Sequence, residues 1–386
     1  MKKILMVAAL AAMGAGAAPV VEITSVQQQY PWTNTVDITY TSTGIAEENT
    51  YYVVFKAQDS AGKEIGVITN DLKVSQGSTW VAQWQPPFNV RYENCTMTPY
   101  VYKGGQDDYM IVDLETWAVT FEGMATQDAS NKKYNTNNDY KTKKLVLRKV
   151  PAGKYTITEN GNGNYYDGSA MFPNHVHEST FDKDFYVGIF EFTEAQWAYA
   201  LGDGAFSKTS LLPRSNVSWN TVRGSAGSGA QPSSGLIWQL NAKTGRKGFD
   251  LPTAPMWEVA ARAGVSTKFL SGDTAANLAA YAWYDGTTNR KNVGQKLPNN
   301  WGLYDVSGNC WELTRDSVYE GDYTNQESNG LLPRTTGRAT SEVTVGIGVN
   351  GGSTADRVTA GLSMRHANGK GQTYAQLGFR VAYIVE

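Results

Sequence analysis

The side chains best suited to chemistry in this sequence are few, and the histidines are the first to consider. His175 and His177 alternate along a strand-like segment and are followed by Glu178, so the two imidazoles could share one face and hold a metal ion. A zinc site needs three or four such ligands, and no third ligand is evident. We therefore expect these histidines to be structural.

A second group could act in proton transfer. Arg365 and His366 follow Asp356 closely in the sequence, and histidine with a carboxylate is a common acid–base pair. A lone histidine beside an arginine is more often structural. The chain also lacks a Gly-rich phosphate loop before a strand–helix unit and a Gly-x-Ser-x-Gly elbow. Residue types alone therefore define no catalytic centre.

The chain has only two cysteines, Cys95 and Cys310. An exported protein could join them in one disulfide. Because they fall in different predicted domains, we expect instead two buried free thiols that behave as small apolar residues.

The elements that position these residues fall into two predicted domains. Residues 18–125 contain short strand-like runs at intervals of roughly ten residues, typical of an all-β immunoglobulin-like sandwich. Residues 126–144 are polar and are predicted to be a linker. Residues 145–386 are dense in Gly, Asn and aromatic residues and predict an irregular α+β domain. Two helices stand out there by their caps, Thr193 followed by Gln196, and Thr253 followed by Pro255.

The N-terminus predicts export. Two lysines, a short apolar run from residue 4 to residue 12 and Ala15-Gly16-Ala17 form a signal peptide over residues 1–17, with cleavage before Ala18. The run is far shorter than the roughly 20 residues of a membrane-spanning helix, so we expect no transmembrane segment in the mature chain. A net charge of -2 without a basic run argues against a nucleic-acid partner.

A series of short motifs in the second domain resembles, in order, the sulfatase-modifying-factor family, whose fold is that of the formylglycine-generating enzymes. The most recognisable are Gly-Asn-Cys-Trp-Glu at 308–312, Gly-Gly-Ser at 351–353 and Gly-Phe-Arg at 378–380. Further matches lie at 150–153, 184–193, 216–219, 248–253, 257–264 and 293–296. The resemblance covers about residues 145–385 and implies an irregular mixed domain related to C-type lectin folds.

The chain departs from the family at the reactive positions. The resemblance places the two active-site cysteines of the family at Asp356 and Gly361, where no thiol is present. A thiolate pair is what selects Cu(I), so we expect neither copper nor iron and no formylglycine-generating activity. Asp250 also stands where the family usually has an arginine.

Calcium is the family feature that we expect to remain. The resemblance implies as ligands the side chains of Asp305 and Glu312 and the carbonyls of Gly308 and Cys310. Calcium accepts such mixtures of carboxylate and carbonyl oxygens from one tight loop. The alternative is that the two carboxylates make hydrogen bonds without metal.

These observations favour an exported, non-catalytic binding or scaffold protein with an unknown glycan or envelope or extracellular protein as partner. We expect recognition on loops between residues 354 and 376. An oxidoreductase-type enzyme with an altered site, either sulfatase-modifying or a non-haem-iron relative, is the alternative, and a matrix component is a third possibility. The candidate binding residues are Asp356, Arg357, Arg365, His366, Asn368 and Tyr374.

Overall fold

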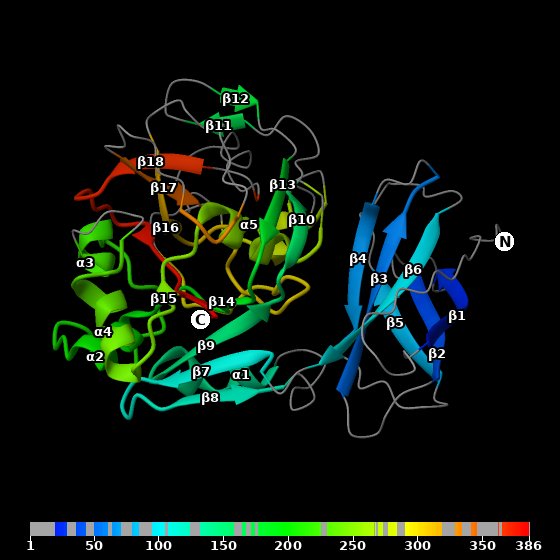
Figure 1. The fold of residues 1–386 in the computed structure, drawn as a ribbon, viewed down its shortest axis with the longest axis horizontal. Coiled ribbons are helices and arrows are strands. Elements are labelled where there is room, and N and C mark those ends of the chain that lie inside the picture. The colour runs from blue at the N-terminus through cyan, green and yellow to red at the C-terminus, as the bar shows by residue number, and fades with distance from the viewer. Residues whose placement is uncertain are drawn as a thin grey trace. The chain divides into compact units, whose positions relative to one another are not determined.

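The computed structural model separates into two compact units, and each is described by itself (Figure 1). One unit comprises residues 1–108, 122–132 and 264–266 and contains strands β1 to β6. The other comprises residues 109–121, 133–263 and 267–386. The described residues are 20–28, 36–43, 50–60, 64–70, 79–84, 95–104, 107–123, 132–157, 164–166, 171–173, 177–224, 230–265, 267, 269–272, 277–283, 290–318, 329–333, 341–345, 362 and 365–385.

The first unit consists of two three-stranded antiparallel sheets. One has the order β1 (Val20–Gln28), β2 (Val36–Thr43), β5 (Thr79–Trp84), and the other β4 (Glu64–Asn70), β3 (Thr50–Gln58), β6 (Thr96–Gly104). Alternate residues of β2 are buried, as period-two patterning requires. Residues of both sheets form one hydrophobic cluster, in which the rings of Tyr40 and Phe55 lie 4.9 Å apart. The all-β content was predicted, while the immunoglobulin-like class stays a prediction.

The second unit is mixed α/β and is built on a six-stranded sheet. Its order is β15 (Phe249–Asp250), β20 (Ala382–Ile384), β14 (Phe185–Gly188), β9 (Lys144–Val150), β7 (Tyr109–Asp113), β8 (Val119–Glu122). A four-stranded sheet has the order β18 (Arg365–Gly369), β17 (Ser341–Val345), β16 (Trp311–Val318), β19 (Leu377–Gly378). The described residues also form two antiparallel two-stranded sheets, β10 (Gly153–Ile157) with β13 (His177–Phe181) and β11 (Asn164–Tyr166) with β12 (Met171–Pro173).

Short helices accompany these sheets. They are α1 (Lys132–Thr136), the 3-10 turn η2 (Asn138–Lys141), α2 (Glu194–Leu201), α3 (Trp219–Arg223), α4 (Gly235–Thr244), α5 (Ala254–Arg262) and the 3-10 turn η3 (Leu278–Ala280). Both predicted caps are confirmed: Thr193 and Gln196 form a capping box on α2, and Thr253 caps α5 with Pro255 in its first turn. No helix in the described ranges is both long and apolar enough to cross a bilayer.

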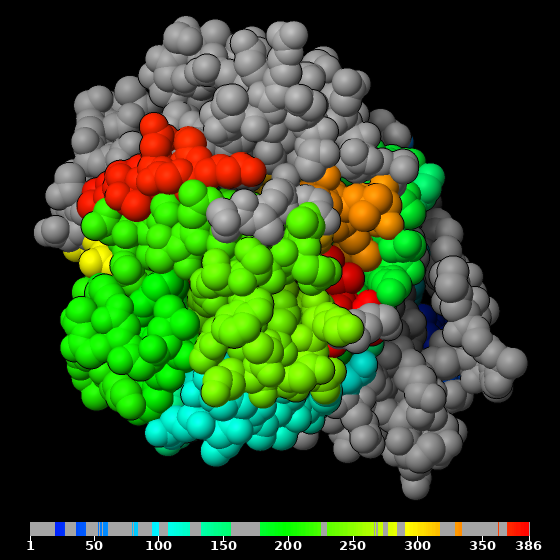
Figure 2. Space-filling model, turned by 60° about the vertical axis from the view of Figure 1, so that its left-hand side comes forward, coloured from blue at the N-terminus to red at the C-terminus, as the bar shows by residue number. Residues whose placement is uncertain are grey.

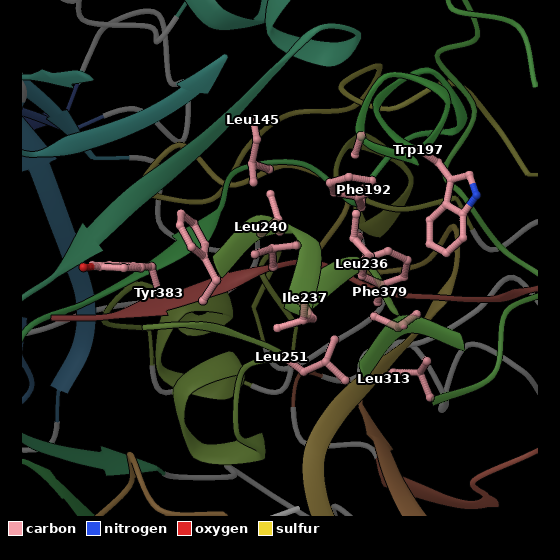
Figure 3. Packing of buried hydrophobic residues seen from close by; sticks show 14 of the residues in the cluster. Leu145, Phe192, Trp197, Leu236, Ile237, Leu240, Leu251, Leu313, Phe379 and Tyr383 are labelled. Atoms are coloured by element: carbon pink, nitrogen blue, oxygen red, sulfur yellow. The ribbon is translucent and has the colours of Figure 1, made fainter. Parts of the chain in front are cut away.

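The main core lies between α4 and the sheet. Leu236, Ile237 and Leu240 of α4 belong to the same buried cluster as Phe192 and Phe379 (Figure 3). These two phenyl rings stack with centroids 5.2 Å apart.

The structure divides the chain earlier than the predicted boundary at residue 125. Strand β7 pairs antiparallel with β9 of the second unit, and Met110 and Val112 join its core. Within the stretch predicted as a linker, 126–144, the described residues 132–144 include α1 and η2, with Tyr134 and Tyr140 buried. The sequence did not indicate that residues 132–144 pack in the fold, because this polar segment contributes only a few buried aromatic side chains among its Asn and Lys residues.

Candidate functional site

A buried ion pair forms the centre of the second unit. Parallel pairing of β16 with β19 places Glu312 opposite Gly378, so Arg380, two residues later, reaches the Glu312 carboxylate. Arg380 Nη2 lies 2.6 Å from Glu312 Oε1, and Arg380 Nε lies 2.7 Å from Glu312 Oε2. The same Oε2 accepts a 2.7 Å hydrogen bond from the indole of Trp257 on α5. Both ionic residues are almost fully buried.

The loop before β16 is held in an unusual backbone conformation. Gly302, Asp305, Gly308 and Asn309 all have φ between 55° and 85°, the left-handed region. Gly308 also passes so close to the backbone of Trp283 that a side chain there would clash. Gly, Asn and Asp are the residues that tolerate this conformation, which explains the local composition.

Asp305 has one carboxylate oxygen without a partner. Its Oδ2 accepts a 2.7 Å hydrogen bond from the Gly294 amide, whereas its buried Oδ1 accepts none. Burial raises the pKa of Asp305 to about 6. The Gly294 hydrogen bond and the charges of Arg380 and Lys141 oppose that rise, while the charge of Glu312 adds to it.

Glu191 is the third carboxylate of this acid cluster, which we define as Glu191, Asp305 and Glu312. Its oxygens accept hydrogen bonds from Asn309 Nδ2 at 2.5 Å and from the Cys310 amide at 2.9 Å. Burial, followed by the charges of Asp305 and Glu312, raises its pKa well above the ordinary glutamate value. Three buried carboxylates thus share two cations, Arg380 and Lys141, and retain an excess of negative charge when all are ionised.

The predicted calcium ligands fit this geometry in part. Asp305 offers an unused buried oxygen, and a cation would balance the negative charge of the acid cluster when all three carboxylates are ionised. A carboxylate can accept about four hydrogen bonds. Glu312 already accepts two from Arg380 and one from Trp257, so one acceptor position remains for a metal ion. Cys310 and Gly308 lie in the same loop. Within the described ranges, no three His, Cys, Asp or Glu side chains form a group arranged for metal binding.

Both cysteines are free and buried, as predicted. The Cys310 side chain is fully buried, and burial, followed by the nearby charge of Glu191, raises the pKa of its thiol well above the ordinary value. Burial also raises the pKa of the Cys95 thiol. A thiol is reactive as its thiolate, so neither cysteine is prepared for nucleophilic or redox chemistry.

The structure describes the predicted recognition residues only in part. Asp356, Arg357 and Gly361 lie outside the described residues. Arg365, His366 and Asn368 were predicted on a loop but stand on strand β18, which pairs with β17, and Tyr374 is half-buried against the core. Strand β18 has only five residues and no alternation of apolar and polar side chains, which is why its sequence suggested a loop.

The other candidate metal group is also described only in part. His175 lies outside the described part of the chain, and His177 and Glu178 stand on β13. The Glu178 carboxylate forms an ion pair with Lys154 Nζ on the neighbouring strand β10 at 2.9 Å.

Sequence reasoning missed the partners of Asp250. This carboxylate binds Arg223 through Nε at 2.6 Å and Nη2 at 3.0 Å, and Arg315 Nε lies 3.2 Å away. Arg223 is fully buried and covers one part of the Trp219 ring. The departure from the family at Asp250 is therefore matched by two arginines, a pairing between distant positions that a single sequence does not reveal.

The fold and the acid cluster define an irregular mixed α/β domain that lacks a reactive thiol. The family model described as "Sulfatase-modifying factor enzyme 1-like domain" matches residues 130–384, about two thirds of the chain. This protein therefore belongs to the sulfatase-modifying-factor family, as the motifs predicted.

Individual relatives are more distant. "Chaperone protein LppX" of Paenibacillus barcinonensis is 26% identical over 175 residues, which cover 34% of this chain and 62% of that protein. The solved structures of Treponema denticola variable protein 1 and of PvdO from Pseudomonas aeruginosa are each 19% identical with a TM-score of 0.49. Each match covers 62% of this chain, with 95% of the first structure and 94% of the second.

Proposed function

We propose that this protein is an exported, non-catalytic member of its family that binds a glycan or an envelope or extracellular protein. The observation that carries the proposal is the state of the thiols. The positions of the family's cysteines are Asp356 and Gly361, and the remaining Cys310 is fully buried with a raised thiol pKa. A site without a thiolate has no ligand for Cu(I) and no sulfur to exchange with a substrate cysteine.

The direct test of this proposal is an activity assay. Copper-treated protein is incubated in air with a cysteine-containing sulfatase peptide, and the peptide is followed by mass spectrometry. We expect the thiol peptide to remain unchanged. Turnover to the aldehyde would overturn the non-catalytic role and support the altered-enzyme alternative.

The recognition surface is proposed to include residues 354–376. Arg357 and Asn368 supply a charge and an amide, and Tyr374 supplies an aromatic ring. Because Tyr374 packs against the core, its replacement by Phe removes the hydroxyl while keeping that packing. Arg357→Ala, Asn368→Ala and Tyr374→Phe together should leave the melting temperature nearly unchanged and abolish capture from a glycan array or an envelope extract. Retained capture would exclude these residues.

Export is tested separately, by N-terminal sequencing of the protein recovered outside the cytoplasm. Processing before Ala18 is the expected result. An unprocessed Met1 would contradict it.

Calcium is proposed as a structural ion bound by Asp305 and the Gly308 and Cys310 carbonyls, with Glu312 offering its one remaining acceptor position. The unpartnered Asp305 Oδ1 supports this proposal. When bound, the ion would neutralise the excess charge of the acid cluster and fix the loop before β16.

A further inference from the structure

Two stretches of the second unit contain no acidic residue. Residues 204–249 include six Lys and Arg and no Asp or Glu, and residues 357–385 include four and none. The rest of the chain has 24 basic and 36 acidic residues, so the net charge of -2 conceals a strong segregation. Arg223 and Arg380 are buried in ion pairs, so only the other cations can create a positive surface where the two stretches lie together.

The fold brings the two stretches together. The Asn220 amide donates to the Lys370 carbonyl at 3.3 Å, and Ser215 Oγ donates to the Ala375 carbonyl. Figure 2 shows the red segment near the C-terminus lying directly against the green residues around α3, with the yellow-green residues that include α4 on the same face.

Cations of this face lie over aromatic rings. Lys208 Nζ is 4.5 Å from the centroid of Tyr199, Arg214 Cζ is 4.3 Å from Phe206, and Lys370 Nζ is 4.8 Å from Trp219. Arg246 lies over Phe121 and Tyr383. A ring holds a cation in place but does not neutralise its charge. In the described residues, Lys208, Arg214, Lys243 and Arg246 form no ion pair with a carboxylate.

Arg214 is the clearest member of this set. It also lies 4.8 Å from Trp197, and its buried Nε has no hydrogen-bond partner. The nearest acids are otherwise engaged: Asp203 accepts from Trp197 Nε1 and the Ala205 amide, and Glu194 pairs with Arg290 at 3.0 Å. Burial lowers the pKa of Arg214 more than the charges of Glu194 and Asp203 raise it, and the guanidinium donates to the Ser215 carbonyl without forming an ion pair in the described residues.

Neutral groups on the same stretches suit a sugar. Trp238 on α4 is 47% exposed, and Tyr199 and Phe206 are partly exposed at the edge of the core. Residues 204–249 also contain 16 Ser, Thr, Asn and Gln residues, which can bond to hydroxyl groups. Aromatic platforms with hydroxyl-bonding side chains and unneutralised cations fit a polyhydroxylated ligand that carries negative charge.

We propose that this basic face, defined as Lys208, Arg214, Lys243, Arg246, Lys370 and Trp238, binds an anionic polysaccharide through its carboxylate or sulfate groups. The inference rests on the proposed binding role and names its ligand class. A duplex is a poorer fit because phosphate-backbone binding uses a denser row of cations. A lipid surface is a poorer fit because membrane insertion needs a broad apolar face. Among the described residues of α2 and α4, only Leu201 and Trp238 are exposed large apolar side chains.

The test measures binding of the full chain to polygalacturonate, heparin and neutral dextran, as carboxylated, sulfated and uncharged polymers. We expect binding to one or both anionic polymers, weakening as NaCl rises, and none to dextran. Comparison of the first two polymers identifies the anionic group. Duplex DNA and anionic phosphatidylglycerol vesicles are the competing partners, and stronger binding to either would overturn the proposal.

Variants locate the site. Lys208→Gln with Lys243→Gln should weaken polymer binding about tenfold, roughly threefold for each exposed cation removed, and reduce the salt dependence. Trp238→Ala should weaken binding without changing the salt dependence. Lys154→Gln with Lys183→Gln removes the same charge from other exposed positions and should have at most a small effect. Equal loss in both double variants would show general attraction and overturn the assignment.

Different experimental results would contradict the proposed non-catalytic binding role and the proposed basic face. Loss of glycan-array capture on changing residues 357, 368 and 374, without any polymer binding, would retain the binding role and remove the basic face. Formylglycine production would remove the non-catalytic role, while polymer binding would still be decided by the charge variants.

Discussion

At the residue scale, Arg380 connects segments that are far apart in the sequence. Besides Glu312, it donates to the Gly188 carbonyl at 2.9 Å and to the Tyr304 carbonyl at 3.2 Å. Burying a guanidinium costs desolvation free energy, and its ionic and hydrogen-bond partners offset that cost only while all of them are present.

Arg380→Met should therefore lower the free energy of unfolding by about 3–5 kcal/mol, because it leaves the Glu312 charge buried without its cation. Denaturant unfolding measures the change. Lys154→Met breaks an exposed ion pair and should cost less than about 1 kcal/mol. Adding Glu312→Gln to Arg380→Met should recover part of the loss, and full additivity of the two changes would contradict the coupling.

Asp305 tests the calcium proposal. Asp305→Asn keeps a residue that tolerates the left-handed backbone and an oxygen for the Gly294 amide, but removes the charge. Calcium at a hundredfold excess over its dissociation constant should stabilise the unmodified protein by about 2.7 kcal/mol, a shift of several degrees in melting temperature. The variant should melt equally with calcium and with chelator. Identical melting of the unmodified protein under both conditions would count against the ion.

Asp184 links stability to acid pH. Burial raises its pKa, but the Ala152 amide and the Lys149 ammonium, 2.9 Å away, outweigh burial and lower the pKa overall. Its contribution is therefore present above the ordinary aspartate pKa of about 3.9 and is lost as pH falls through the lower folded-state value. Asp184→Asn should destabilise the protein at pH 7 and flatten this acid limb. An unchanged difference between pH 7 and pH 3 would refute the assignment.

At the element scale, β7 belongs to the family domain although the family model begins at residue 130. Met110, Val112 and Leu114 are buried in the core with Leu145 and Leu147 of β9. Three such side chains contribute roughly 5–9 kcal/mol in total, which is comparable with the stability of a whole domain.

Removal of this strand should therefore prevent stable folding. A fragment of residues 107–386 should unfold cooperatively, whereas 132–386 should aggregate or melt at least ten degrees lower. Circular dichroism during heating compares the two. Equal melting of both fragments would mean that β7 is dispensable.

At the scale of the whole molecule, metal content distinguishes the binding role from the enzyme alternative. Under the proposed binding role, purified protein should contain calcium near one ion per chain and no stoichiometric copper or iron, because the family resemblance places the thiol positions at Asp356 and Gly361. Elemental analysis after gel filtration provides the measurement. Stoichiometric iron or copper would favour catalysis.

The sequence by itself determined what depends on local order. Cap residues marked α2 and α5, alternating strands marked the first unit, and the ordered motifs identified the family. It also placed Asp305 and Glu312 near each other, because they are seven positions apart, although the structure puts Glu312 on β16 after the loop.

Only the tertiary structure decided what depends on contacts across long separations. Arg380 lies 68 residues from Glu312, and Arg223 lies 27 from Asp250, yet each pair is in direct contact. The attachment of β7 to β9 crosses a polar segment that resembled a linker. Local propensity carries no record of such pairings, because burial and charge neutralisation arise only when distant segments meet.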